Sequence, residues 1–235
     1  IAALLNGALG HSLDFDDTHA DSSLHPSAPV VPAAFAVGEI MGSSGRDVLT
    51  AIVAGYEVCC RLGNALDPTS HYAKGFHPTA TAGTYGAAAA AAKLYKLSPE
   101  QIVSAFGVSG SQAAGSLQFL VNGAWNKRYQ VGAAAMNGLM AALLAAEGFK
   151  GAAEPIEGIH GFLKGYSDDA DPAVAHFDAD QVAGGAAGRC NADRDMAALR
   201  ELQRVADQIA QHLAQAGGVA LHQRGQALVQ RQVDR

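Results

Sequence analysis

The sequence predicts an all-α protein, a multi-helix bundle, and three observations support this fold class. Apolar residues recur every three or four positions in the longer segments, which is the spacing of one face of a helix. The alternation of apolar and polar residues that is typical of strands does not occur anywhere up to Gly148. Segments rich in Ala and Gly would let neighbouring helices approach closely, so we expect tight helix contacts.

The first half of the chain predicts three helices. Ile1–Leu9 is expected to be the end of a helix, and an apolar helix follows over Val30–Met41, where Pro32 is acceptable in the first turn. Ser44 is a good N-cap for a helix over Gly45–Leu66, because the apolar residues of that segment fall on one face.

Three further helices are expected before residue 149. The first is rich in Ala and Gly and covers Thr79–Leu94. The next follows Ser98 and covers Pro99–Ala114, because Pro suits the first helical position and Gln101 completes a capping box. An Ala-rich helix over Lys127–Gly148 ends at its glycine.

Composition and charge limit the classes of function. The 235 residues are 49% hydrophobic and 16% charged, which is enough apolar material for a sizeable core. The net charge is −6 and no basic stripe occurs, so we expect no nucleic-acid partner. The apolar run Ala87–Ala92 is too short to span a bilayer and no signal peptide is recognisable, so we expect a cytoplasmic protein without a membrane partner. The three cysteines lack zinc spacing and suit reduced, buried thiols.

Three polar loops interrupt the apolar segments, and each carries groups suited to a functional site. They cover residues 11–29, 67–78 and 115–126, and the last leads directly into two basic residues. The side chains that we single out in or beside these loops are Asp14, Thr18, His25, His77, Lys127 and Arg128.

These side chains could form one pocket if the loops meet at one end of the bundle. His25 and His77 could transfer protons near neutral pH, and Asp14 could orient a histidine. Lys127 and Arg128, beside a helix N-terminus, would attract the carboxylates of a substrate. The alternatives are two rigid His-Pro turns and a solvated basic pair. Other polar residues of the loops are interpreted as caps, or as structural or exposed groups: Asp16, Asp17, His11, His19, His71 and His160.

The acidic residues of the first loop could also bind a metal ion. Asp16, Asp17 and Asp21 have the form DDxxxD, which occurs in the isoprenoid synthases, and these are all-α as well. Binding of Mg²⁺ and diphosphate would need a second acidic cluster on a facing helix. No such cluster occurs in the bundle segments, and neither does an HExxH motif, so we expect no metal.

Taken together, the motifs resemble those of the MmgE/PrpD family, which includes 2-methylcitrate dehydratase, cis-aconitate decarboxylase and an iminodisuccinate epimerase. The resemblance covers about residues 1–171. It rests on four motifs in the same order and with close spacing: Asn6-Gly-Ala-Leu-Gly-His-Ser-Leu-Asp-Phe-Asp-Asp-Thr18, His25-Pro-Ser, Gly75-Phe-His-Pro-Thr79 and Lys127-Arg128.

The resemblance implies a large helical domain and a smaller α+β lid domain, usually in a homodimer, with an active site between the domains that needs no metal or organic cofactor. It further implies that Asp14 and Thr18 are pocket residues and that His25 and His77 handle the proton at the carbon next to a carboxylate. Lys127 matches a lysine that helps hold the carboxylates of the substrate.

Two departures from the family pattern set the expected domain boundaries. Residues 1–170 are expected to be the helical domain without the family's first helices, since the chain does not begin with Met. Residues 171–191 are interpreted as a linker and residues 192–235 as an atypical helical tail, which contains no lysine. A lid domain is not recognisable, so the chain is interpreted as a fragment or as a member with a replaced C-terminal part.

The expected function is therefore that of a lyase. The main hypothesis is a hydro-lyase that dehydrates a small di- or tricarboxylate such as 2-methylcitrate, as in propionate metabolism, or decarboxylates one. Two alternatives remain open at this point: an epimerase of the same family, and a non-catalytic fragment that retains only the helical scaffold. The expected partners are a small carboxylate and a second copy of the chain.

Overall fold

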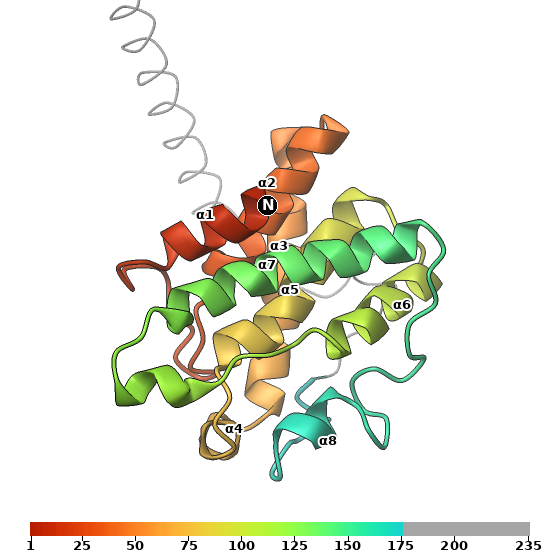
Figure 1. Ribbon diagram of the computed structural model, residues 1–235. Coiled ribbons are helices and arrows are strands. Elements are labelled where there is room, and N and C mark those ends of the chain that lie inside the picture. Colours follow the sequence, from red (N-terminus) through yellow and green to blue (C-terminus); the bar gives the residue numbers. More distant parts are fainter. Residues whose placement is uncertain (176–235) are drawn as a thin grey trace, which may run out of the picture. The chain divides into compact units, whose positions relative to one another are not determined.

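The computed structural model describes residues 1–175, which form eight α-helices and one 3₁₀ helix and contain no strand (Figure 1). The all-α prediction is therefore confirmed for this part of the chain. The predicted tail at 192–235, and all but five residues of the predicted linker, lie outside the described residues. The helices are α1 (Ala2–Gly10), α2 (Ser27–Met41), α3 (Gly45–Ala65), α4 (Pro68–Ala73), α5 (Pro78–Leu94), α6 (Pro99–Gly110), η1 (Leu117–Val121), α7 (Asn126–Ala146) and α8 (Phe162–Tyr166).

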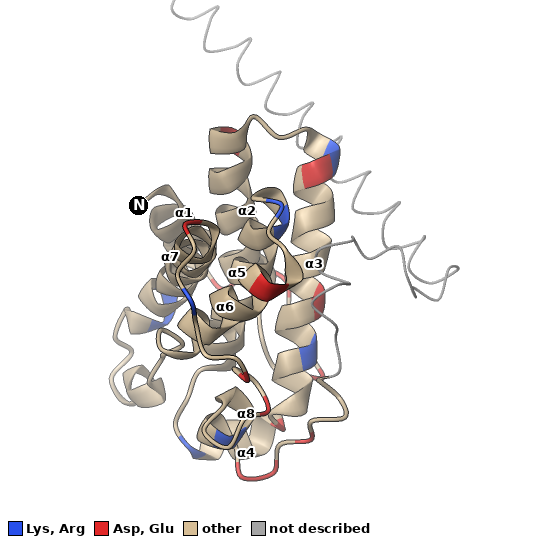
Figure 2. Cartoon of the chain, turned by 90° about the vertical axis from the view of Figure 1, so that its right-hand side faces the viewer, with Lys and Arg blue, Asp and Glu red and all other residues tan. Residues whose placement is uncertain are grey.

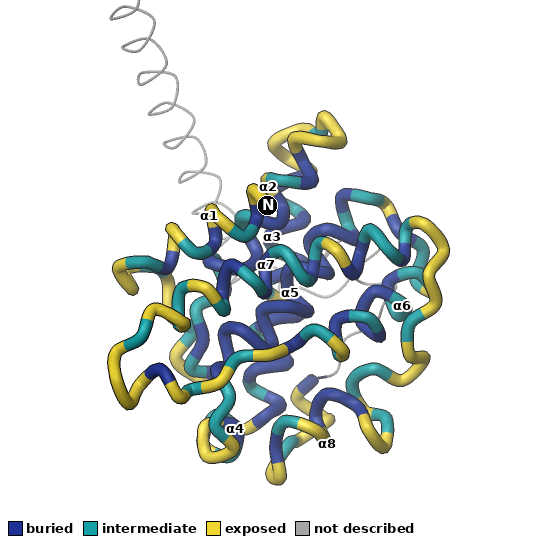
Figure 3. Tube along the Cα trace, in the orientation of Figure 1, coloured by how far each residue is buried: buried dark blue, intermediate teal, exposed yellow. Residues whose placement is uncertain are grey.

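Helix α5 forms the centre of the bundle, and all of its residues except Lys93 are buried (Figure 3). Helices α3 and α7 pack on opposite sides of it, and α2 and α6 also contact it (Figure 2). The one charged residue of α5 is Lys93, whereas α3 carries charged residues near its start and along its exposed side (Figure 2). The Ala-rich segment thus forms the core, because its small side chains let four neighbours approach.

Glycines allow the closest of these approaches. A Cβ on Gly55 of α3 would lie 2.7 Å from the carbonyl oxygen of Gly86 in α5. A Cβ on Gly138 of α7 would lie 2.3 Å from the carbonyl oxygen of Thr84 in α5. Real Cβ atoms do not occupy such positions, so these contacts require glycine.

The predicted helix starts are confirmed with small shifts. The Ser44 hydroxyl accepts the backbone N–H of Asp47, and Ser98 and Gln101 form the expected capping box. Helix α2 begins at Ser27, three residues before the predicted start, because the Asp17 carboxylate accepts the Ser27 backbone N–H at 3.1 Å.

Two segments that we predicted to be irregular loops contain short helices. Helix α4 begins where the Asp67 carboxylate accepts the backbone N–H of Ser70 at 2.9 Å, and η1 lies within the third loop. Helix α6 ends at Gly110, four residues before the predicted end. The unpredicted α8 is docked by the buried His71, whose Nδ1 donates to the Tyr166 carbonyl oxygen at 2.8 Å. His71 is therefore structural, as interpreted.

Helix α7 is the one helix within residues 1–175 that is long and apolar enough to cross a membrane, by length and composition alone. It contacts α1, α2, α5 and α6, so packing within the bundle accounts for its apolar residues. Of the cysteines, Cys59 is buried and Cys60 partly buried, and both are free thiols, in line with the expected role as small core residues. Cys190 lies outside the described residues.

Candidate active site

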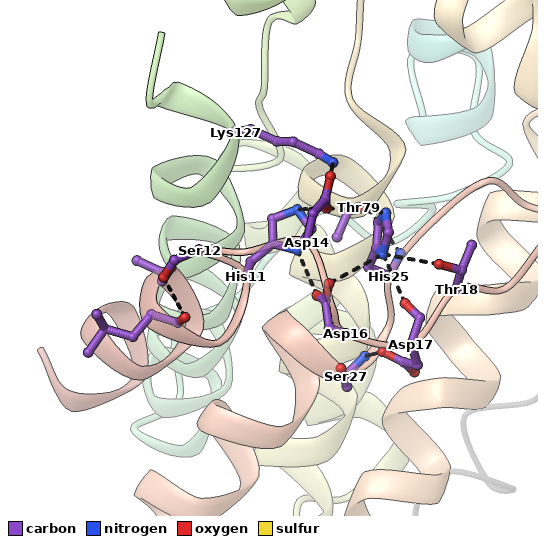
Figure 4. A network of polar contacts seen from close by, with 12 residues as sticks. His11, Ser12, Asp14, Asp16, Asp17, Thr18, His25, Ser27, Thr79 and Lys127 are labelled. Atoms are coloured by element: carbon purple, nitrogen blue, oxygen red, sulfur yellow. Dashed lines mark hydrogen bonds and ion pairs between the residues drawn. The ribbon is translucent and has the colours of Figure 1, made fainter. Parts of the chain in front are cut away.

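Side chains from three parts of the chain meet at one end of the bundle: the loop between α1 and α2, the start of α5 and the start of α7 (Figure 4). The ring centroid of His11 lies 4.9 Å from that of His25 and 6.2 Å from that of His77. The Lys127 ammonium lies 2.6 Å from Asp14 Oδ1, and this oxygen lies 3.8 Å from His25 Nε2. Three polar loops thus converge as the sequence predicts. We call His11, Asp14, Asp16, His25, His77 and Lys127 the imidazole–carboxylate cluster.

The tautomer of His25 follows from its hydrogen bonds. Its Nδ1 lies 2.9 Å from the backbone carbonyl oxygen of Asp17, which can only accept a hydrogen bond. Nδ1 therefore carries the proton, and in the neutral ring Nε2 holds a lone pair on the side that faces Asp14. The Thr79 hydroxyl accepts the His25 backbone N–H at 3.1 Å and links the loop to α5. His25 is thus held in the form that can take up a proton.

His77 is the N-cap residue of α5 and is almost completely buried. Its backbone N–H donates to the Gly115 carbonyl oxygen at 2.9 Å, which fixes the start of the helix. Burial lowers the pKa of His77 to about 3, and the charge of Lys127, together with that of His11 whenever its ring is protonated, acts in the same direction. The ring is therefore neutral at neutral pH, and its buried Nδ1 has no hydrogen-bond partner within the described residues.

Asp14 and Lys127 form an ion pair at the rim of the cluster. The side chains are 51% and 30% exposed, and the ammonium contacts both carboxylate oxygens. The hydrogen bond from Lys127 lowers the pKa of Asp14, so the carboxylate stays ionised. Asp14 has a φ of +59°, a left-handed conformation that Asp tolerates better than most residues. Its backbone therefore accepts Asn or Gly without added strain.

The remaining two predicted residues differ in position. Thr18 is exposed at the edge of the cluster, with Oγ1 3.4 Å from His25 Nδ1. The guanidinium of Arg128 lies 5.1 Å from the centre of the Trp125 ring, and within residues 1–175 no hydrogen bond or ion pair joins it to the cluster. Consecutive helical residues point about 100° apart, so the two side chains of the basic pair leave α7 in different directions. The structure brings Lys127 to the cluster, and a substrate-binding role for Arg128 stays a prediction.

The sequence analysis missed His11 and Asp16. The side chain of His11 is fully buried, and its Nδ1 lies 2.6 Å from Asp16 Oδ2 (Figure 4). We interpreted His11 as a structural or exposed residue and Asp16 as a cap. Of the two residues interpreted as caps, Asp17 does cap a helix, since it accepts the Ser27 backbone N–H at the start of α2, and it also accepts the Tyr56 hydroxyl at 2.8 Å. His11 is the C-cap residue of α1, and nothing in its sequence position distinguished it from the other polar residues of the loop.

Four members of the cluster could offer ligands to a metal ion. His11, Asp14, Asp16 and His25 each have a donor atom, and these atoms lie within 4.8 Å of one another. A divalent cation would meet the Lys127 ammonium, which already contacts both oxygens of Asp14. Lys127 supplies a positive charge at that place, and the absence of a metal from the working site stays a prediction.

Two surface cavities of the bundle lie near or away from the cluster, as their lining residues show. One of about 450 Å³ is lined by residues 154–158 and Ala175 and lies away from the imidazoles. Another of about 400 Å³, between α1 and α2, reaches the cluster only at Asp16. Neither of these cavities is lined by Asp14 or Lys127, whose side chains at the rim are partly exposed.

Comparison of the sequence with known proteins shows which family it matches and which proteins are similar to it. The profile of the MmgE/PrpD N-terminal domain matches residues 1–175. A cis-aconitate decarboxylase-like protein of Aspergillus oryzae is 38% identical over 157 residues, which is 64% of this chain and 32% of that protein. The cis-aconitate decarboxylases of Aspergillus terreus and Homo sapiens are each 35% identical, over 69% and 75% of this chain and 34% and 37% of theirs. The chain spans about a third of the length of these relatives.

Proposed function

Because the chain belongs to the MmgE/PrpD family of lyase-type dehydratases and decarboxylases, we propose that its cluster is the helical-domain part of a cofactor-independent lyase site for a small di- or tricarboxylate. One observation carries this proposal: three imidazoles lie beside one exposed ion pair, Asp14–Lys127. Because the curated relatives named above are cis-aconitate decarboxylases, cis-aconitate is the first substrate to test.

Binding would begin at Lys127. Its ammonium is at the rim and lies in the first turn of α7, where the N-terminal end of the helix favours an anion. A substrate carboxylate would compete with Asp14 for this ammonium. The N-terminus of α5, capped by His77, adds a second favourable end for negative charge.

His25 and His77 would then transfer the proton. In a decarboxylation, the bond between carbon and the leaving CO₂ breaks, its electron pair stays on the carbon skeleton, and a protonated imidazole delivers a proton to that skeleton. In a dehydration, a neutral imidazole removes the proton and an acid protonates the departing hydroxide. His25 offers Nε2 for either step. A bound polyanion would raise the low pKa of His77 and let it hold a proton.

Dehydration of 2-methylcitrate and an epimerase reaction are the alternatives within the family, and both would use the same proton transfer. The exposure of Asp14 and Lys127 fits a site that a further domain covers, as the family resemblance implies. We include a homodimer and a cytoplasmic location in the proposal.

The test is incubation of the protein in D₂O with cis-aconitate or 2-methylcitrate, followed by ¹H NMR. Loss of CO₂ with one deuterium incorporated supports decarboxylation, whereas an alkene formed from 2-methylcitrate supports dehydration. Deuterium exchange without an alkene product supports epimerisation. If neither acid reacts and neither binds in a calorimetric titration, the proposal is wrong and a non-catalytic scaffold is left.

A further inference from the structure

His11 and Asp16 form a buried pair behind the rim that the proposed reaction does not use. Asp16 is 8% exposed, and its Oδ2 accepts a hydrogen bond from His11 Nδ1 at 2.6 Å. With Nδ1 protonated, the neutral ring has a lone pair on Nε2. The titratable and charged groups that face His11 come from the loop, α5 and α7: Asp14, Asp16, His25, His77 and Lys127.

The Nε2 atom of His11 is a buried polar atom that faces a carboxylate oxygen without a hydrogen bond. It is buried, it has no hydrogen-bond partner within residues 1–175, and it lies 3.5 Å from Asp14 Oδ1. A lone pair and a carboxylate oxygen that face each other repel unless a proton lies between them. In the present arrangement the Lys127 ammonium neutralises Asp14 from the other side. Burial lowers the pKa of His11, with Asp16 opposing this effect, so the ring is neutral while Lys127 stays in place.

Starting from the proposed function, we infer that the His11–Asp16 pair is a positioning device for Asp14. When a substrate carboxylate takes Lys127, His11 binds a proton from the solvent on Nε2 and keeps it, and the new Nε2–H donates a hydrogen bond to Asp14 in place of the ammonium. Asp16 stabilises the imidazolium formed. Lys127 can then move away from Asp14 while the Asp14 carboxylate keeps a positively charged partner. Substrate binding is thereby coupled to proton uptake at His11.

A purely structural role would need only the bond between Nδ1 and Asp16. It would give no reason for the protonation of His11 to depend on both Lys127 and Asp14. The test therefore measures that dependence, first without any ligand.

The first experiment follows the ring signals of His11 in ¹H–¹⁵N spectra against pH in three proteins: wild type, Lys127→Met, and Lys127→Met with Asp14→Asn. We expect the midpoint of His11 to rise by about one pH unit or more in Lys127→Met, because Asp14 is then unpaired. Asp14→Asn should remove most of this rise. The left-handed backbone at Asp14 tolerates Asn, so the double variant should fold.

Two results would overturn the inference: an unchanged His11 midpoint in Lys127→Met, or a rise that persists when Asp14 is Asn. The second result would mean that His11 responds only to the loss of the repulsive ammonium. The exposed His160 gives an internal control whose ring signals should be the same in all three proteins.

The second experiment depends on the proposed function and uses tricarballylate, a tricarboxylate with neither a hydroxyl group nor a double bond. Calorimetry in buffers of different ionisation enthalpy gives the number of protons taken up on binding. We expect His11→Gln to reduce this uptake and to weaken binding about tenfold, and Asp14→Asn in the same background to restore affinity, because Asn no longer competes for Lys127. The control is His19→Gln, in the same loop, whose ring bonds to Ser22.

The two failures can be told apart. If neither tricarballylate nor the two acids named above bind the wild type, the proposed function fails, and the ligand-free spectra alone test the His11–Asp16 pair. If it binds with equal proton uptake in wild type and His11→Gln, the inference fails while the proposed function stands.

Discussion

Lys127 and Arg128 are neighbours in sequence with different surroundings, so the pair gives a matched test at the scale of single residues. Lys127→Met removes the charge beside Asp14, whereas Arg128→Met removes a cation that lies over Trp125. A charge-assisted hydrogen bond contributes about 1.5–3 kcal/mol, so we expect Lys127→Met to weaken tricarboxylate binding by roughly tenfold to a hundredfold. Arg128→Met should change it less than about twofold. Equal losses in a calorimetric titration would contradict the assigned roles.

The two predicted proton carriers can be tested in the same way. His25→Gln and His77→Gln should each lower kcat by roughly 10²–10⁴-fold, which is the usual contribution of a general acid or base, with a smaller change in KM. The reference variant is His19→Gln. The measurement is steady-state kinetics with whichever acid reacts in the D₂O experiment described above. Normal turnover in both variants would refute the proton-transfer roles.

At this scale, much of the site could be predicted from the sequence. Asp14, His25 and His77 were recognisable because each stands in a polar loop between apolar helices, and Lys127 because it directly follows such a loop; the four side chains do converge. Which residue of Lys127-Arg128 faces the site depends on the helix phase at Asn126, and composition does not specify this. His11 is a single imidazole among many polar residues, and only its burial reveals its place.

At the scale of elements, glycines at the contacts between α5 and its neighbours allow the helices to pack closely. Gly138→Ala would put a Cβ 2.3 Å from the Thr84 carbonyl oxygen, so we expect a loss of about 1–3 kcal/mol in the free energy of unfolding. Gly45→Ala at the exposed start of α3 is the control: nothing lies within 4 Å of the added Cβ, so stability should stay equal or rise slightly. Urea titrations measure both, and equal stabilities would show that the α5–α7 contact is not tight.

The long helices could be predicted because apolar spacing and caps agree, as at Ser44 and Ser98. Helices α4 and α8 could not be predicted from periodicity, because six and five residues are too few to show it. The Asp67-Pro68 start was a usable cap signal for α4. Helix α8 depends on the long-range bond from His71, which no local pattern contains.

For the whole molecule, the buried histidines make stability depend on pH. Burial lowers the pKa of His77 from 6.5 to about 3 in the folded protein, so between these values the unfolded chain binds a proton that the folded chain does not. Stability should therefore fall as pH falls below about 6.5, by up to about 1.4 kcal/mol per pH unit for this group alone. Burial also lowers the pKa of His11 and His71, with the same sign.

The check is urea unfolding at several values between pH 7 and 4.5, above the range where most carboxylates titrate. His77→Gln should flatten the dependence on pH, while His160→Gln, at an exposed turn, should leave it unchanged. If His77→Gln and wild type lose stability in parallel, His77 is not held neutral by burial.

The central claim is that one carboxylate ligand reaches Lys127 and the imidazoles together. A titration of tricarballylate followed by the histidine side-chain NMR signals tests it most directly. We expect the signals of His11, His25 and His77 to shift along one binding curve while His160 does not move, and we expect Lys127→Met to move that curve to roughly tenfold to a hundredfold higher ligand concentration. Signals that stay unchanged at millimolar ligand, or that shift equally in Lys127→Met, would contradict it.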